Sequence, residues 1–233
     1  MRDAAAGAVR RGAKPPDHRR SDAASSRIDL DDADVGRAVG PKDVARMESR
    51  LRDAARAFER ERYQEARKLL VPLADRMPAN AAVRELLGLT HYRTGRWKQA
   101  IAELETFREL TGSTEQHPVL ADCYRALRRW HEVDELWEEL REVSPSAELV
   151  TEGRIVVAGS LADRGRLPEA IALLEKGFRF PKNPLGHHLR RAYALADLRE
   201  RAGDLPQARS LFERVAAADP EFGDVAGRVD SLR

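Results

Sequence analysis

The sequence predicts an all-α solenoid of about five helix-turn-helix units, and three observations support this prediction. One short motif recurs five times at intervals of about 33 to 38 residues, which is the period of a two-helix repeat. Each copy is followed by a large apolar residue one helical turn later, and all but the fourth, which has Gly177, by another at the next turn, as on a helix face that packs against a neighbour. Each copy then ends at a proline or a glycine, residues that commonly stop a helix.

The N-terminal segment, residues 1–27, carries seven basic residues against three acidic ones and has no periodic apolar pattern. Because ordering the backbone costs about 1–2 kcal/mol per residue, burial cannot offset that cost here, and we expect a disordered basic tail. Its apolar run, residues 4–9, is too short for a secretory signal. Two roles for the tail stay open: a solubilising extension, or phosphate contacts with RNA or DNA through Arg10, Arg11, Arg19 and Arg20.

The sign of the charge changes after the tail. Four aspartates fall within eight residues of the segment 28–41, and two glycines and a proline follow them. This composition predicts an acidic linker over residues 28–41. The repeat domain is then expected over residues 42–222.

The recurring motif is an aromatic or leucine residue followed three positions later by a small or β-branched anchor. The anchors are Ala66, Ala100, Val133, Ala170 and Ala208. Four positions after each anchor stands a large apolar residue: Leu70, Leu104, Trp137, Leu174 and Phe212. The copies end at Pro78, Gly112, Pro145, Pro181 and Pro220. Each copy therefore predicts a hairpin whose two helices approach closely at a small anchor.

Further small residues fit the same hairpins. We expect small side chains where the first helix of a unit crosses the second, at Gly88, Ala121, Ala158 and Ala196. Glycines suited to the interhelical turn stand at Gly95, Gly165 and Gly203. Extra residues with two prolines, around 178–188, predict a lengthened connection between the fourth and fifth units. Residues 223–233 place three apolar side chains on one helical face and predict a C-terminal capping helix.

At this point the chain resembles the tetratricopeptide repeat (TPR) family. The clearest copy runs from Leu87 to Ala100, where a Leu-Gly pair, an aromatic residue, a turn glycine, Trp97 and the anchor alanine fall at the family's spacing. The resemblance extends from about Val44 to Pro220. It implies a right-handed superhelix of helical hairpins whose first helices line a concave surface that binds a protein partner.

The composition excludes several classes of protein. The formal net charge is +2 with 34% charged residues, so no uniform nucleic-acid-binding field is expected. The apolar stretches are far shorter than the roughly 20 residues of a membrane span, and the single cysteine cannot form an internal disulfide. We expect a reduced cytoplasmic protein without a membrane anchor. The abundance of Ala, Arg, Leu and Glu is typical of high-G+C bacterial coding.

No sequence motif predicts an enzyme, a cofactor or a metal site. Phosphate-binding glycine loops, H-E-x-x-H and C-x-x-C are missing. Cys123, with His131 eight residues later, is better explained as a small core residue than as a nucleophile. The pair His187 and His188 is better explained by a helix start or loop than by metal binding, because adjacent residues point in different directions. The tryptophans Trp97, Trp130 and Trp137 are expected to pack between units.

The family resemblance assigns a set of residues to the concave groove. They are Glu85, Leu89, Tyr92, Arg93, Asp122, Arg125, Arg190, Tyr193, Asp197 and Arg201. Five of them, Tyr92, Arg93, Arg125, Arg190 and Tyr193, are the expected anchors for a peptide or helix of a partner protein. The set lacks the Lys and Asn residues with which chaperone-binding members hold a C-terminal carboxylate. Two alternatives stay open: a solvated face with ion pairs along each helix, and a nucleic-acid-associated protein that uses the basic tail.

Overall fold

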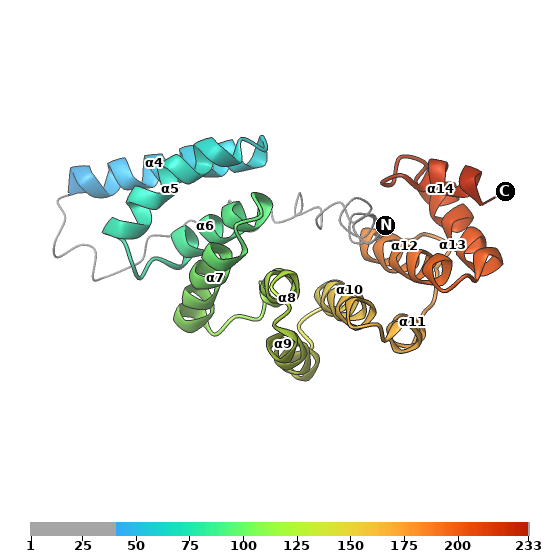
Figure 1. The fold of residues 1–233 in the computed structure, drawn as a ribbon. Helices are drawn as coiled ribbons and strands as arrows, with labels where there is room; N and C mark the ends of the chain where they lie inside the picture. The colour runs from blue at the N-terminus through green and yellow to red at the C-terminus, as the bar shows by residue number, and fades with distance from the viewer. Residues whose placement is uncertain (1–40, 233) are drawn as a thin grey trace. The chain divides into compact units, whose positions relative to one another are not determined.

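The computed structural model describes residues 41–232, with side chains from residue 43 onward. The predicted tail, residues 1–27, and all but the last residue of the predicted linker, 28–41, lie outside the described residues. Between residues 41 and 232 the regular structure consists of eleven α-helices and no strand (Figure 1). This confirms the predicted all-α solenoid class. Each predicted unit supplies two helices in succession.

The helices follow one another along the chain with short connections. In the first half they are α4 (Pro41–Glu59), α5 (Tyr63–Arg76), α6 (Ala81–Arg93), α7 (Trp97–Thr111) and α8 (His117–Ala126). In the second half they are α9 (Trp130–Val143), α10 (Ala147–Asp163), α11 (Leu167–Glu175), α12 (Gly186–Arg201), α13 (Leu205–Ala218) and α14 (Val225–Ser231). The chain divides into two compact units, which we call the N-terminal unit (residues 41–129) and the C-terminal unit (residues 130–232).

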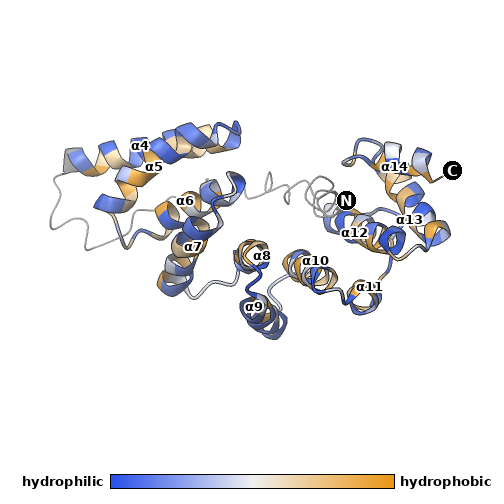
Figure 2. Cartoon of the chain, viewed as in Figure 1, coloured by the Kyte–Doolittle hydropathy of each residue, from blue (hydrophilic) through white to orange (hydrophobic). Residues whose placement is uncertain are grey.

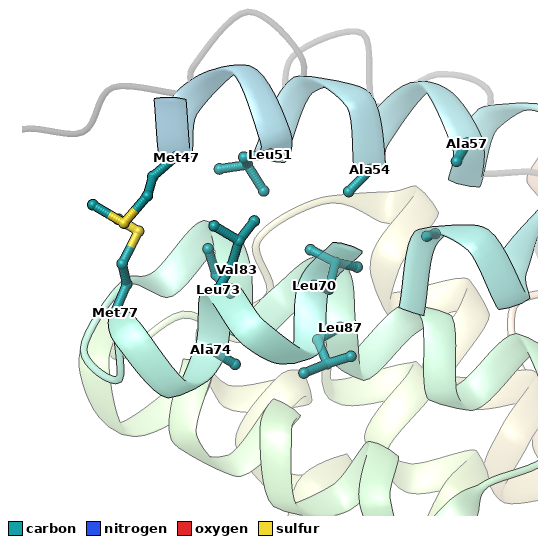
Figure 3. Packing of buried hydrophobic residues seen from close by; sticks show 11 residues of the cluster. Met47, Leu51, Ala54, Ala57, Leu70, Leu73, Ala74, Met77, Val83 and Leu87 are labelled. Carbon is teal, nitrogen blue, oxygen red and sulfur yellow. The ribbon is translucent and has the colours of Figure 1, made fainter. Parts of the chain in front are cut away.

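The core of the N-terminal unit lies where α4, α5 and α6 meet. Leu51 of α4, Leu70 of α5 and Val83 of α6 are each at most 2% exposed and form part of one cluster. Figure 3 shows these side chains converging, with Met47 and Met77 pointing toward one another at one end of the cluster. The pattern follows from amphipathic helices whose apolar faces turn inward. Figure 2 shows that these helices carry both hydrophobic and hydrophilic residues.

The C-terminal unit is built in the same way. The helix pairs α10 with α11 and α12 with α13 pack against each other, and α10 also contacts α12. The largest fully buried side chain of this unit is Phe212 of α13, which is 0% exposed. The short helix α14 packs on α13 and buries Val225 to 1% exposure.

All five predicted anchors are buried to 0% exposure. The two helices of a unit also approach closely at Gly88, where a Cβ atom would lie 2.6 Å from Cγ of Leu104 on the facing helix α7. A Cβ atom fits this crossing only if the Leu104 side chain or one of the two helices shifts. The prediction that small residues mark the close crossings is therefore confirmed at this hairpin.

The interhelical turns share one backbone conformation. The residue five positions before each anchor has a positive φ, at Glu61, Gly95, Arg128, Gly165 and Gly203. The three glycines were predicted from the sequence. Glu61 and Arg128 adopt the same left-handed conformation, at φ 58° and 59°, although side chains disfavour it. The hairpin geometry therefore overrides local preference in the first and third units.

The connection between the fourth and fifth units is longer than the other turns, as predicted. Helix α11 ends at Glu175 and α12 begins at Gly186. His188 caps the start of α12, since its Nδ1 atom accepts a hydrogen bond of 3.0 Å from the backbone N–H of Leu185. The ring of His187 lies 4.0 Å from that of His188, centroid to centroid. The histidine pair thus has the predicted helix-start position.

Candidate protein-interaction surface

In the N-terminal unit, the residues assigned to the groove lie on α6 and α8 and form hydrogen bonds with one another. The Tyr92 hydroxyl donates to Oδ2 of Asp122 at 2.9 Å, and Nη1 of Arg125 pairs with Oδ1 of the same carboxylate at 3.1 Å. Burial is the main cause that raises the pKa of Tyr92 well above its usual value, and the Asp122 carboxylate raises it further. Tyr92 therefore stays a neutral donor. The fold thus places three of the predicted groove residues, Tyr92, Asp122 and Arg125, in contact with one another.

A second bond links α6, near its other end, to the residue before α8. Nε2 of Gln116 donates to Oε1 of Glu85 at 2.7 Å. Burial raises the pKa of Glu85, whereas this hydrogen bond lowers it to a smaller extent. Glu85 is half-buried, so the amide fixes a carboxylate that is still partly open to solvent.

Arg93 and Leu89 complete the predicted set on α6. Nε of Arg93 donates to the hydroxyl of Tyr63 at 2.9 Å, and its guanidinium group lies over the Tyr63 ring, 5.4 Å from the centroid. Within residues 43–232 no carboxylate pairs with Arg93 at ion-pair distance. Leu89 is half-buried.

In the C-terminal unit, Arg190 of α12 is held by two carboxylates of α10. Its Nε donates to Glu152 and its Nη2 donates to Glu148 at 3.1 Å. Burial raises the pKa of Glu152, and the neighbouring Arg190 opposes that rise. The side chains of Arg190 and Glu152 are only 18% and 12% exposed, so this pair joins α10 to α12 more than it faces solvent.

Tyr193 and Asp197, the other predicted groove residues of α12, are buried to 6% and 8% exposure. The Tyr193 hydroxyl donates to Asp224, and Arg228 of α14 donates to Asp197. The expectation that these two side chains face an accessible groove is therefore corrected: α14 and the residue before it cover them. Arg201, near the end of α12, is exposed.

The partners of the predicted residues share a spacing that sequence reasoning did not use. The pairs Tyr63–Arg93, Glu85–Gln116, Tyr92–Asp122, Tyr193–Asp224 and Asp197–Arg228 are each 30 or 31 residues apart. Since the repeat period is only slightly longer, these are contacts between successive repeats. A search for complementary polar residues about one period apart would have found Gln116, Tyr63 and Arg228.

His91, next to Tyr92, is a buried imidazole at 6% exposure whose Nδ1 atom has no partner. Burial is the main cause that lowers its pKa; Glu103 opposes this, while Arg96 and Arg67 add to it. The folded state therefore disfavours the protonated form, and the unfolded state takes up the proton more readily. The free energy of unfolding therefore has its full value above the pKa of His91 in the unfolded chain, near 6.5, and falls as the pH drops below that value.

We expect His91→Phe to flatten the fall in unfolding free energy between pH 7 and pH 5. The difference between the two proteins in the pH slope of the unfolding free energy is at most about 1.4 kcal/mol per pH unit, because one proton is involved. Urea denaturation of both proteins at the two pH values measures it. The raised pKa values of Glu85 and Glu152 act in the opposite direction in both proteins, so the difference between the proteins is the readout. The control is His131→Gln, at an exposed position; equal slopes for His91→Phe and the unaltered chain would contradict the prediction.

The described residues include one cysteine and no metal-binding cluster. Cys123 is buried, and burial followed by the charge of Asp122 raises the pKa of its thiol far above the usual value. Over residues 43–232 no group of three or more His, Cys, Asp or Glu side chains is placed to hold a metal ion. None of the helices α4–α14 is long and apolar enough to span a bilayer.

Comparisons with known proteins agree with the architecture. Residues 57–123 match the family model of the tetratricopeptide repeat. TTC0263, a thermophilic TPR protein of Thermus thermophilus, is similar at 18% identity, over 80% of this chain and 98% of that chain, with a TM-score of 0.61. The pilF protein of Pseudomonas aeruginosa is similar at 12% identity, over 80% and 88% of the two chains, with a TM-score of 0.59. MamA of AMB-1 is similar at 20% identity, over 76% and 93%, with a TM-score of 0.52. No curated protein sequence matches this chain.

These identities are low, so the solved structures establish the fold alone. Residues 57–123 are tetratricopeptide repeats, and the described chain has the fold of tetratricopeptide repeat proteins. The resemblance inferred from the sequence is confirmed. Proteins of this fold are generally scaffolds for protein–protein interaction and are typically non-catalytic.

Proposed function

We propose that this chain is a non-catalytic scaffold that binds a peptide or helix of a partner protein on the first helices of its repeats. In the N-terminal unit the proposed binding surface consists of Glu85, Leu89, Arg93, Asp122 and Arg125, which we call the first-helix surface. The observation that supports the proposal is that these side chains are half-buried and mostly held by bonds within the unit, such as Gln116 to Glu85. A partner would then bind without first ordering them, which favours affinity.

The chemistry of the first-helix surface suits a mixed peptide. Arg93 is fixed through Nε and by the Tyr63 ring, which leaves its two Nη groups for a carboxylate of the partner. Leu89 supplies an apolar contact, and the acidic Glu85 and Asp122 disfavour a polyanion. A continuous nucleic acid strand would meet repulsion here, whereas a peptide with both charges and an apolar residue would not.

The test is affinity capture from a lysate of cells that make the protein. We expect the double variant Leu89→Asp/Arg93→Glu to lose a captured partner that the unaltered chain retains. The matched control is Ala102→Asp/Lys98→Glu, which changes the charge equally at two exposed positions of α7. Thermal unfolding of both variants checks that the fold persists. Equal capture by the two variants would contradict the proposal.

A chain lacking residues 1–27 and a nuclease-treated lysate complete the experiment. We expect the partner to be retained in both. Loss of all capture in either arm would favour the nucleic-acid alternative, whose residues lie outside the described part of the chain. The composition, with one cysteine that is buried, supports a cytoplasmic location for the scaffold.

A further inference from the structure

Two arginines of the C-terminal unit meet at the end of α11. Nη1 of Arg154, on α10, and Nη2 of Arg191, on α12, both donate to the carbonyl oxygen of Lys176, at 2.8 Å and 2.7 Å. Nε of Arg191 also donates to the carbonyl oxygen of Leu174 at 2.9 Å. These carbonyls form the partly negative end of α11, which accounts for the position of the two side chains but neutralises only part of their charge.

Three other partly buried arginines of the same unit are paired with acids, and these two are not. Arg190, Arg199 and Arg228 each contact two carboxylates. Across residues 43–232 no carboxylate lies within ion-pair distance of Arg154 or Arg191. The buried Nε atom of Arg154 has no hydrogen-bond partner, which also holds for the Nε atoms of Arg199 and Arg228. The structure therefore holds two half-buried cations side by side with an unmet demand for an anion.

The charges of the neighbours agree with this geometry. Burial, and then the charge of Arg141, lower the pKa of Arg154. Burial, and then the charge of Arg154, lower the pKa of Arg191 to about 10. A bound anion would relieve the repulsion between the two guanidinium groups.

Aromatic rings flank the two arginines. The guanidinium of Arg154 lies 6.0 Å from the centroid of Trp137, and that of Arg191 lies 5.5 Å from the centroid of Phe178. Phe178 belongs to the long connection between α11 and α12, whose residues 176–185 include three basic residues and no acidic one. We call Arg154, Arg191, Trp137 and Phe178 the arginine cluster.

We propose that the arginine cluster binds an acidic segment of a partner protein, through carboxylates on Arg154 and Arg191. The inference rests on the proposed function as a protein scaffold and names the chemistry of one partner segment. Guanidinium groups present paired donors that match a carboxylate, and the ring of Phe178 offers an apolar contact beside it.

The experiment measures binding of a fluorescein-labelled peptide of glutamate, leucine and serine to the full chain by fluorescence anisotropy. We expect Arg154→Gln/Arg191→Gln to weaken binding by about tenfold or more, the loss of at least one charge-assisted contact. The control Arg166→Gln/Arg209→Gln removes the same charge from the residue before α11 and from α13, in the same unit, and should change binding by less than about twofold. The matching glutamine peptide should not bind.

Phenylglyoxal labelling of the unaltered protein, mapped by mass spectrometry, avoids dependence on the folding of a variant. The glutamate peptide should protect Arg154 and Arg191 and leave Arg166 reactive. Unchanged binding by Arg154→Gln/Arg191→Gln, tight binding of the glutamine peptide, or absence of protection would overturn the inference. Tighter binding of a single-stranded oligonucleotide at the same arginines would also overturn it and assign the cluster to nucleic acid.

The first-helix variant Leu89→Asp/Arg93→Glu separates this inference from the proposed function. Glutamate peptide that binds at Arg93 is lost in this variant, whereas binding through Arg154 and Arg191 should be retained, because the substitutions lie in the other unit. Loss of peptide binding only in Arg154→Gln/Arg191→Gln supports the arginine cluster whatever the capture experiment shows. Failure of the peptide to bind, with capture still dependent on Leu89 and Arg93, would overturn the cluster alone.

Discussion

Replacing Phe212 with alanine should lower the free energy of unfolding by about 3–5 kcal/mol. Phe212 is 0% exposed, its ring meets that of Tyr193 edge-on at 5.2 Å between centroids, and the guanidinium of Arg228 lies 5.1 Å from its centroid. Alanine would leave a cavity where α12, α13 and α14 meet, and no nearby side chain can fill it without leaving its own contacts. Urea denaturation followed by circular dichroism measures the loss.

The control for this prediction is Leu205→Ala on the same helix. Leu205 is 48% exposed, so its truncation should cost less than about 1 kcal/mol. Because each repeat is stabilised mainly by its neighbours, Phe212→Ala should also speed amide hydrogen exchange in α12–α14 before it does so in α4–α6. A loss below about 1 kcal/mol, or a uniform increase in exchange, would show that Phe212 does not hold the C-terminal cap.

Replacing Gly88 with valine should lower the free energy of unfolding by about 2–3 kcal/mol. A Cβ atom at this position would lie 2.6 Å from Cγ and 2.7 Å from Cδ2 of Leu104, and 3.3 Å from the Leu104 backbone nitrogen. Leu104 is itself 1% exposed, so its side chain has no room to move aside. The helices α6 and α7 would have to separate, which also weakens the core beneath them.

The matched control is Gly227→Ala, within α14. An added Cβ there meets no atom within 4 Å, so the substitution should be neutral or should stabilise the chain by up to about 1 kcal/mol through helix propensity. Thermal and urea unfolding of both variants give the comparison. Equal stability of Gly88→Val and the unaltered chain would mean that the α6–α7 crossing is not as close as the structure has it.

The sequence alone predicted much of the fold because the repeat is a local pattern. The helix period places Leu70, Leu104 and Phe212 one turn after the small anchors, and each of these residues is buried. The turn glycines and the long connection before α12 were also predicted from the sequence, because both depend on residues close together along the chain. The resemblance to the tetratricopeptide repeat family followed from the same motif.

The tertiary structure decided what the polar residues do. Several side chains assigned to a groove form bonds to residues about one repeat away, and α14 buries Tyr193 and Asp197. It also decided that Glu61 adopts a left-handed backbone and that Arg154 and Arg191 meet at one carbonyl oxygen. Periodicity specifies the face of a helix on which a residue lies. Which group it meets there depends on contacts between repeats, whose geometry exists only once the helices have packed.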